Sequence, residues 1–173
     1  MVSGWIAPEL GEVDGPAVGP DRPMLEGYHA YQRRTFRNIC AGLTAEQLAS
    51  RPLPSTNLSL LGLARHLAKV ERVWLRIRAG REQIEPLFDP ALGTDYDFEH
   101  IDAADAEAAF ATYDEECRLG DLAAAHADFD DLIEWRYGTW SVRMIYVHLI
   151  GEYARHNGHA DLLRQAIDGV TGR

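Results

Sequence analysis

The sequence predicts an all-α protein, a four-helix bundle with one long crossover connection between two of its helices. Three observations support this prediction. Apolar residues recur at three- and four-residue steps in four long segments, Gly and Pro residues mark the ends of these segments, and no convincing run of alternating apolar and polar residues competes as a strand. The length of 173 residues suits a single domain with one core.

The amino-terminal region, residues 1–22, is expected to form an extended arm, because Gly and Pro recur through it and interrupt any helix. Trp5, Ile6 and Leu10 are apolar enough to lie against the body of the protein or a partner. Residues 23–173 are expected to form the single bundle domain.

The first helix is predicted from Pro23 to just before Gly42, on the spacing of its apolar residues. A short helical turn should follow at Thr44, because Thr44 and Gln47 can form a reciprocal capping box. Pro residues at 52 and 54 then interrupt the helical pattern.

The second helix has the clearest pattern. Asn57 or Ser59 can cap its start, and Gly80 marks its end. Its apolar stripe consists of Leu60, Leu63, Leu67, Val70, Trp74 and Ile77. Residues 81–102, rich in Pro and acidic side chains, are expected to be a long surface connection.

The third helix is expected to open at Asp102 and to continue past Gly120, as far as Ala127. Residues 128–138 are interpreted as irregular. A fourth helix is predicted over residues 142–168, with Gly169 just past its end.

Composition excludes several classes of function. Hydrophobic residues make up 46% and charged residues 25% of the chain, as in a globular protein, and the formal net charge of −10 disfavours nucleic acid and anionic membrane surfaces as partners. The sequence contains no membrane-spanning run and no secretion signal, so a cytoplasmic location is expected. Cys40 and Cys117 are interpreted as packing residues.

Histidine placement carries the strongest functional signal. His148, Glu152 and His156 are spaced by four residues, so they line one face of the fourth helix, and His159 borders that face. His66 lies within the apolar stripe of the second helix, where a buried imidazole needs a partner for each nitrogen. Two imidazoles and one carboxylate around a divalent cation leave an open position, as in catalytic sites. The pattern therefore predicts a metal site between the second and fourth helices.

Two alternatives remain open from the residues alone. The fourth-helix face could be solvated, with Glu152 paired to Arg155 or to a protonated histidine. His66 could be a core histidine bonded to a backbone carbonyl. Three isolated histidines are interpreted as surface or packing residues: His29, His100 and His126.

Two parts of the chain resemble the DinB-like (DinB/YfiT) superfamily of metal-binding four-helix proteins, and in particular its actinobacterial mini-circle-protein branch. They are Pro54-Ser55 followed by residues 60–72, and residues 148–164. The resemblance extends over residues 24–168. It implies a helical bundle, often dimeric, with an open metal site that can use a low-molecular-weight thiol.

The resemblance also implies a ligand set. A glutamate at position 152 is similar to the metal-binding domain of mycothiol-dependent maleylpyruvate isomerase, in which two histidines and a glutamate hold zinc. By this match His66, Glu152 and His156 take the ligand role. Zinc is the expected metal, and nickel or iron would also accept these ligands. Residues expected around the metal or in a pocket are His148, His159, Arg65, Glu71, Trp74 and Trp140.

Three functions follow as hypotheses. The first is a metal-dependent enzyme that activates water or a small thiol, such as a mycothiol-type S-transferase, an isomerase-like enzyme or a hydrolase, with a small molecule and a thiol as partners. The second is a non-catalytic metal-binding stress or interaction protein. The third is a metal-free bundle that forms a homodimer through its helix faces and its amino-terminal arm.

Overall fold

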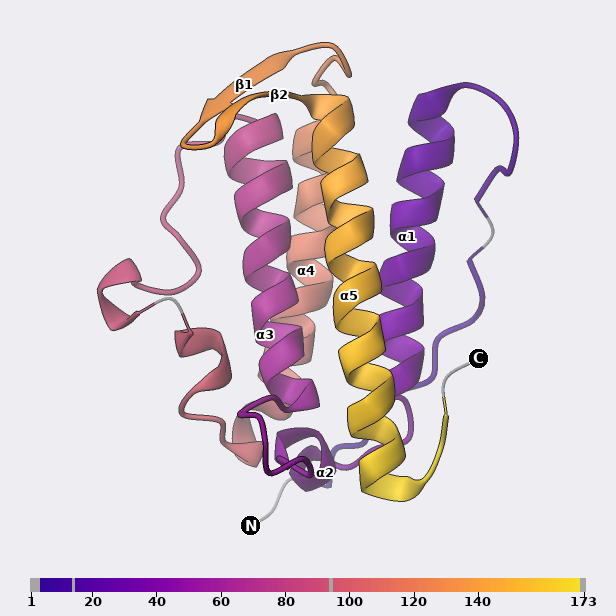
Figure 1. The fold of residues 1–173 in the computed structure, drawn as a ribbon, viewed down its shortest axis with the longest axis vertical. Coiled ribbons are helices and arrows are strands. Elements are labelled where there is room, and N and C mark those ends of the chain that lie inside the picture. The colour runs from indigo at the N-terminus through magenta and orange to yellow at the C-terminus, as the bar shows by residue number, and fades with distance from the viewer. Residues whose placement is uncertain (1–3, 14, 94, 172–173) are drawn as a thin grey trace.

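The structure, a computed structural model, describes residues 4–13, 15–93 and 95–171. Within these residues, long helices pack side by side as a bundle (Figure 1): α1 (Asp21–Cys40), α3 (Leu60–Glu71), α4 (Ala106–Ala124) and α5 (Val142–Asp168). Helices α1 and α5 run in one direction and α3 and α4 run in the other. The predicted all-α bundle with a crossover is therefore confirmed.

Most helix ends lie where short-range chemistry places them. The short helix α2 (Ala45–Ala49) begins with the capping box of Thr44 and Gln47, and Ser59 accepts a hydrogen bond from the backbone at the start of α3. Gly169 ends α5 in the left-handed conformation that glycine tolerates best. Helix α1 begins at Asp21, two residues before the predicted start, because Pro23 is compatible with the first helical turn.

Helix α3 continues directly into a π-helical stretch, η1 (Arg72–Ala79), which ends at Gly80. The crossover over residues 81–102 then returns along the bundle to the start of α4 (Figure 1). It carries two short 3-10 turns, η2 (Pro90–Leu92) and η3 (Tyr96–Phe98), and a third, η4 (Ala103–Asp105), leads into α4. The prediction that residues 81–102 lie on the surface is wrong at η3, because the side chain of Asp97 is buried.

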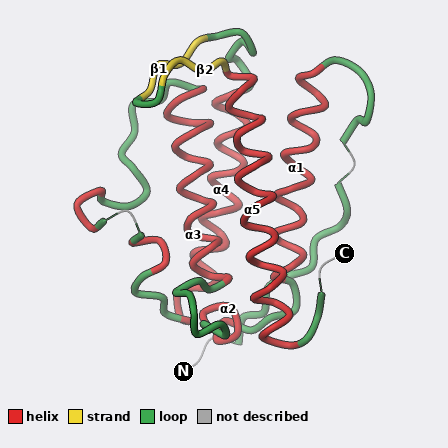
Figure 2. The backbone as a smooth tube through the Cα atoms, viewed as in Figure 1, coloured by secondary structure: helices red, strands yellow, loops and turns green. Residues whose placement is uncertain are grey.

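A β-hairpin connects α4 to α5 along the chain and lies over one end of the bundle (Figure 2). Strands β1 (Leu132–Trp135) and β2 (Gly138–Ser141) pair antiparallel, with Leu132 opposite Ser141. The expectation of an irregular segment over residues 128–138, without strands, is wrong here. Ile133 is buried while Leu132 and Glu134 are exposed, a two-residue alternation too short to stand out in the sequence.

Residues 1–3 and 14 of the predicted arm lie outside the described residues; its first described residues pack on the opposite end of the bundle from the hairpin, and the later ones run along α1 to its start (Figure 1). The backbone of Ala7 bonds to the carbonyl of Leu43, and the ring of Trp5 lies 5.5 Å from that of Phe110, centroid to centroid. Cys40 is fully buried, as expected. None of the helices in the described ranges is long and apolar enough to cross a membrane.

Candidate metal centre

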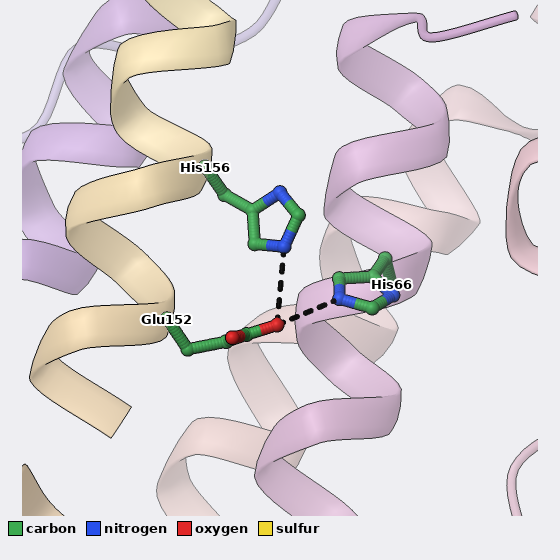
Figure 3. Close-up of side chains that lie close together, drawn as sticks. All are labelled: His66, Glu152 and His156. Carbon is green, nitrogen blue, oxygen red and sulfur yellow. Dashed lines mark hydrogen bonds and ion pairs between the residues drawn. The ribbon is translucent and has the colours of Figure 1, made fainter. Parts of the chain in front are cut away.

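Three side chains from two helices converge between α3 and α5. His66 on α3 and His156 on α5 both point their Nε2 atoms at one oxygen of Glu152, at 3.4 and 3.2 Å (Figure 3). One ligand atom from each of the three residues lies within 4.8 Å of the other two. The three side chains are 10–17% exposed, so the cluster is mostly buried but still reachable from solvent.

Local structure explains this convergence. Glu152 and His156 are four residues apart, about one turn, so the helix places them on the same face of α5. His66 comes from the antiparallel neighbour α3, among apolar residues that fix the packing of the two helices. The three donors therefore all come from two packed helices, α3 and α5.

Electrostatics in the cluster favour a negative Glu152. Hydrogen bonds with His156 and His66 hold the pKa of the Glu152 carboxyl well below its usual range, against the effect of burial. Burial lowers the pKa of His66, but hydrogen bonds with Asp97 and Glu152 outweigh it and raise that pKa above its ordinary value. A cation that binds here would displace protons from the imidazoles and take over their attraction to Glu152.

The donor set fits a divalent transition metal. Imidazole nitrogen and carboxylate oxygen are ligands that zinc accepts, and three protein ligands are typical of its catalytic sites. Ligand atoms about 2.1 Å from a tetrahedral ion lie about 3.4 Å apart, close to the two observed separations of 3.4 and 3.2 Å. The bound on the third separation, between the two imidazole nitrogens, is 4.8 Å, so an ion bound here would draw the two rings closer together.

The second ring nitrogen of His66 is bound by a residue that the sequence did not single out. Its Nδ1 lies 2.9 Å from Oδ2 of Asp97, in the η3 turn of the crossover. Asp97 was hidden in an acidic stretch interpreted as surface. The apolar rings of Tyr96 and Phe98 on either side of it are the signal that could have shown a packed segment.

His159 contacts the other histidine of the cluster. Its Nδ1 lies 3.4 Å from Nδ1 of His156, and the rings meet edge to face. His159 therefore contacts the cluster through His156. The second oxygen of Glu152 lies 3.6 Å from the exposed guanidinium of Arg155, the pair expected for a solvated helix face.

His148 lies one turn before Glu152 but packs into an aromatic group instead of joining the cluster. Its ring centroid is 4.5 Å from that of Trp74 and 5.3 Å from that of Trp140. The rings of Trp74 and Trp140 are stacked 5.3 Å apart, and Trp135 from the hairpin meets both. Burial lowers the pKa of His148. These residues form an aromatic wall where η1, the hairpin and the first turns of α5 meet, and His148 lies one turn of α5 before Glu152.

Arg65 turns toward the crossover and away from the cluster. Its guanidinium donates to the carbonyls of Glu99 at 2.9 Å and Tyr96 at 3.3 Å. It also lines a cavity of about 330 Å³ between α3, α4 and the crossover, together with Phe88.

Glu71 is neither a surface charge nor part of the cluster. Arg33 binds both of its oxygens at 2.7 Å, and the hydroxyl of Tyr153 donates to one of them at 2.7 Å. The side chain is fully buried, and Nε2 of the buried His29 lies 3.1 Å from the same carboxylate, without hydrogen-bond alignment. His29 is thus a packing histidine, as expected.

A family model described as mycothiol-S-transferase matches residues 24–169, which includes the bundle and all three residues of the cluster. No curated protein matches the chain.

Proposed function

The chain belongs to the mycothiol-S-transferase family, and from this premise we propose that it is a metal-dependent transferase that passes a mycothiol-type thiol to a small electrophile. In this proposal His66, Glu152 and His156 hold a divalent cation, with zinc the expected ion. The observation that carries the proposal is the convergence of three donor atoms from α3 and α5 within 4.8 Å.

The donor set leaves room for a substrate at the ion. A divalent cation held by these residues would lower the pKa of a thiol at its open position, so that the thiol would release its proton to solvent and be available as a thiolate at neutral pH. Transfer would form one sulfur–carbon bond as the electrophile's leaving group departs with its electron pair. The role of the chain is to fix the donors: α5 holds Glu152 and His156 one turn apart, and α3 brings His66 to the same oxygen.

The aromatic wall beside the cluster is the proposed substrate contact. Trp74 is buried, whereas Trp140 and His148 are half-buried and therefore reachable from solvent. Apolar ring faces next to a polar centre would exclude water and orient a small organic molecule. We assign Trp140 and His148 to this substrate contact, and Trp74 to the support behind them.

Metal content tests the first step of the proposal. Protein purified without chelator should contain about one divalent ion per chain by elemental mass spectrometry, with tight zinc binding in competition with a chromophoric chelator. His156→Ala should lose this metal, whereas His126→Ala, on the exposed turn after α4, is the matched control and should keep it. Unchanged metal content in His156→Ala would refute the ligand assignment.

Thiol transfer tests the second step. Metal-loaded protein mixed with mycothiol and a generic electrophile should form the conjugate, measured by mass spectrometry, faster than the metal-free protein or His156→Ala does. Metal binding without conjugate formation for a panel of electrophiles would instead favour a non-catalytic protein in which the ion joins α3 to α5.

A further inference from the structure

In the described part of the crossover, the η3 turn over residues 96–98 contacts His66 of the candidate metal centre. We propose that Asp97 in this turn is a positioning residue: it holds the proton of neutral His66 on Nδ1, so that Nε2 faces the cluster as a free electron pair. The inference rests on the proposed function, because it gives His66 a metal to bind. It assigns the crossover a role at the site that the helices alone do not supply.

Asp97 is built into the protein at this contact. Its side chain is 1% exposed, and its Oδ2 lies 2.9 Å from Nδ1 of His66. The same oxygen forms an ion pair with Nζ of Lys69, which follows His66 by three residues and so lies on the same face of α3. With the Lys69 ammonium beside it, this oxygen is placed to accept a hydrogen bond from Nδ1 of His66.

Competition between two carboxylates decides where the imidazole proton lies. Neutral His66 has one N–H, and either Asp97 at 2.9 Å or Glu152 at 3.4 Å can accept from it. The shorter contact favours Asp97, and Glu152 is shared with His156. The proton therefore stays on Nδ1, and Nε2 is free to bind a metal.

The backbone around Asp97 is also held against α3. The ring of Phe98 stacks on that of His66, with centroids 5.2 Å apart and 27° between the planes. Gly62 allows this approach, because a Cβ atom there would lie 3.0 Å from the Phe98 ring and 3.1 Å from Oγ of Ser59. Arg65 fixes the turn from the other side by donating to the Tyr96 carbonyl. The turn thus limits both the rotation and the tautomer of His66.

His156, the other histidine of the cluster, has a different kind of partner at its second ring nitrogen. Nδ1 of His156 meets a second imidazole, that of His159, at 3.4 Å. An imidazole can accept or donate there, so this contact does not fix one tautomer as a buried carboxylate does. His66 is therefore the preorganised ligand of the pair, and Asp97 is the residue that makes it so.

Metal affinity is the first test. Asp97→Asn should weaken zinc binding by about 10- to 100-fold, the usual effect of removing such a partner, in a competition titration against a chromophoric chelator. Asp95→Asn is the matched control, because Asp95 is exposed on the same segment two residues away. Circular dichroism checks that both variants keep the helical fold. A folded Asp97→Asn that binds zinc as tightly as the wild type would overturn the proposal.

The tautomer of His66 is the second test and requires no metal. Nitrogen-15 spectra of the metal-free wild type, at a pH where the ring is neutral, should show a protonated Nδ1 and an unprotonated Nε2. In Asp97→Asn this preference should weaken or reverse, because the amide can donate to Nδ1. A proton on Nε2 in the wild type would overturn the proposal even if Asp97→Asn does not fold.

These two readouts separate the inference from the proposed function. If the wild type binds no divalent metal, the transferase proposal fails, while the nitrogen spectra still decide what Asp97 does to His66. If metal binds and the tautomer is the expected one, an Asp97→Asn variant with weaker affinity supports both.

Discussion

Two glutamates of the bundle lie against histidines, yet their surroundings differ. Glu71 on α3 is fully buried, with both oxygens bound by Arg33 and one also by Tyr153. Glu152 on α5 is 15% exposed, and one of its oxygens faces the nitrogens of His66 and His156. Both carboxylates are held charged, because hydrogen bonds and nearby charges lower the pKa of each well below its usual range.

The difference lies in the partners. A guanidinium cannot lose its proton in a protein, so the Arg33–Glu71 pair is closed and serves only the fold. Imidazoles can give up their protons and then offer lone pairs, so the Glu152 cluster can exchange protons for a cation. The bundle thus has one buried ion pair that fixes the helices and one exchangeable cluster that is suited to chemistry.

The largest effect is expected when the closed pair is broken. Glu71→Gln leaves the buried guanidinium of Arg33 without its main counter-charge, which should cost about 3–5 kcal/mol of unfolding free energy. Denaturant unfolding of chelator-treated protein measures this cost. Glu107→Gln, on an exposed position of α4, is the control and should change stability by about 0.5 kcal/mol or less. A loss of about 1 kcal/mol for Glu71→Gln would show that the two carboxylates are not distinct.

The counterpart substitution in the open cluster should behave in the opposite way. Glu152→Gln should destabilise the metal-free protein less than Glu71→Gln does, because the amide oxygen can still accept from the imidazoles and no permanently charged guanidinium is left buried without a partner. It should abolish tight metal binding and remove the ligand-dependent stabilisation, which for the wild type is about 2.7 kcal/mol at a free metal concentration 100 times Kd. Thermal melts with and without added zinc measure both effects. A variant that is still stabilised by zinc would place the ion elsewhere.

The pH dependence of stability should separate the two regions through their histidines. Burial, followed by repulsion from Arg33, lowers the pKa of His29 below its ordinary value of 6.5. Below that pH the histidine is therefore protonated in the unfolded chain but stays neutral in the folded protein. The unfolding free energy should therefore fall as the pH drops below about 6.5, with up to about 1.4 kcal/mol per pH unit from this one residue.

In the metal-free protein, His66 makes the unfolding free energy change with pH in the opposite direction to His29. Its pKa is raised in the fold, so its stabilisation is complete below about 6.5 and is lost as the pH rises through the higher folded value. Unfolding of chelator-treated wild type and His29→Asn between pH 8 and 5 tests the assignment. The variant should lose less stability on acidification than the wild type does. Parallel curves for the two proteins would contradict a neutral, buried His29.

Local chemistry explains which parts of the structure could be predicted. The fourth helix was predicted with the observed bounds, because Ser141 and Gly169 act on the residues next to them. The row of His148, Glu152 and His156 could be assigned to one helix face for the same reason, since helical spacing is fixed within one or two turns.

Contacts between distant segments explain what could not be predicted. Asp97 reaches His66 across 31 residues of sequence, and Arg33 reaches Glu71 across 38. Nothing near Glu71 in the sequence shows that a guanidinium from α1 will neutralise it, so it was grouped with the candidate pocket residues. The hairpin over residues 132–141 was missed because each strand is only four residues long.

The smallest effect on metal binding is expected at His148, which shares the helix face of the cluster but packs against the stacked rings of Trp74 and Trp140. His148→Ala should leave the metal stoichiometry intact, measured by elemental mass spectrometry beside His156→Ala. If His148 contacts the substrate as proposed, conjugate formation by the variant should be slower than by the wild type. Its zinc affinity should stay within about threefold of the wild-type value, because the three metal ligands are unchanged. Metal loss as large as that of His156→Ala would mean that His148 swings toward Glu152 and belongs to the ligand set. The comparison between a closed and an exchangeable carboxylate would survive that outcome, but the exchangeable cluster would then have four protein donors and less room for a substrate.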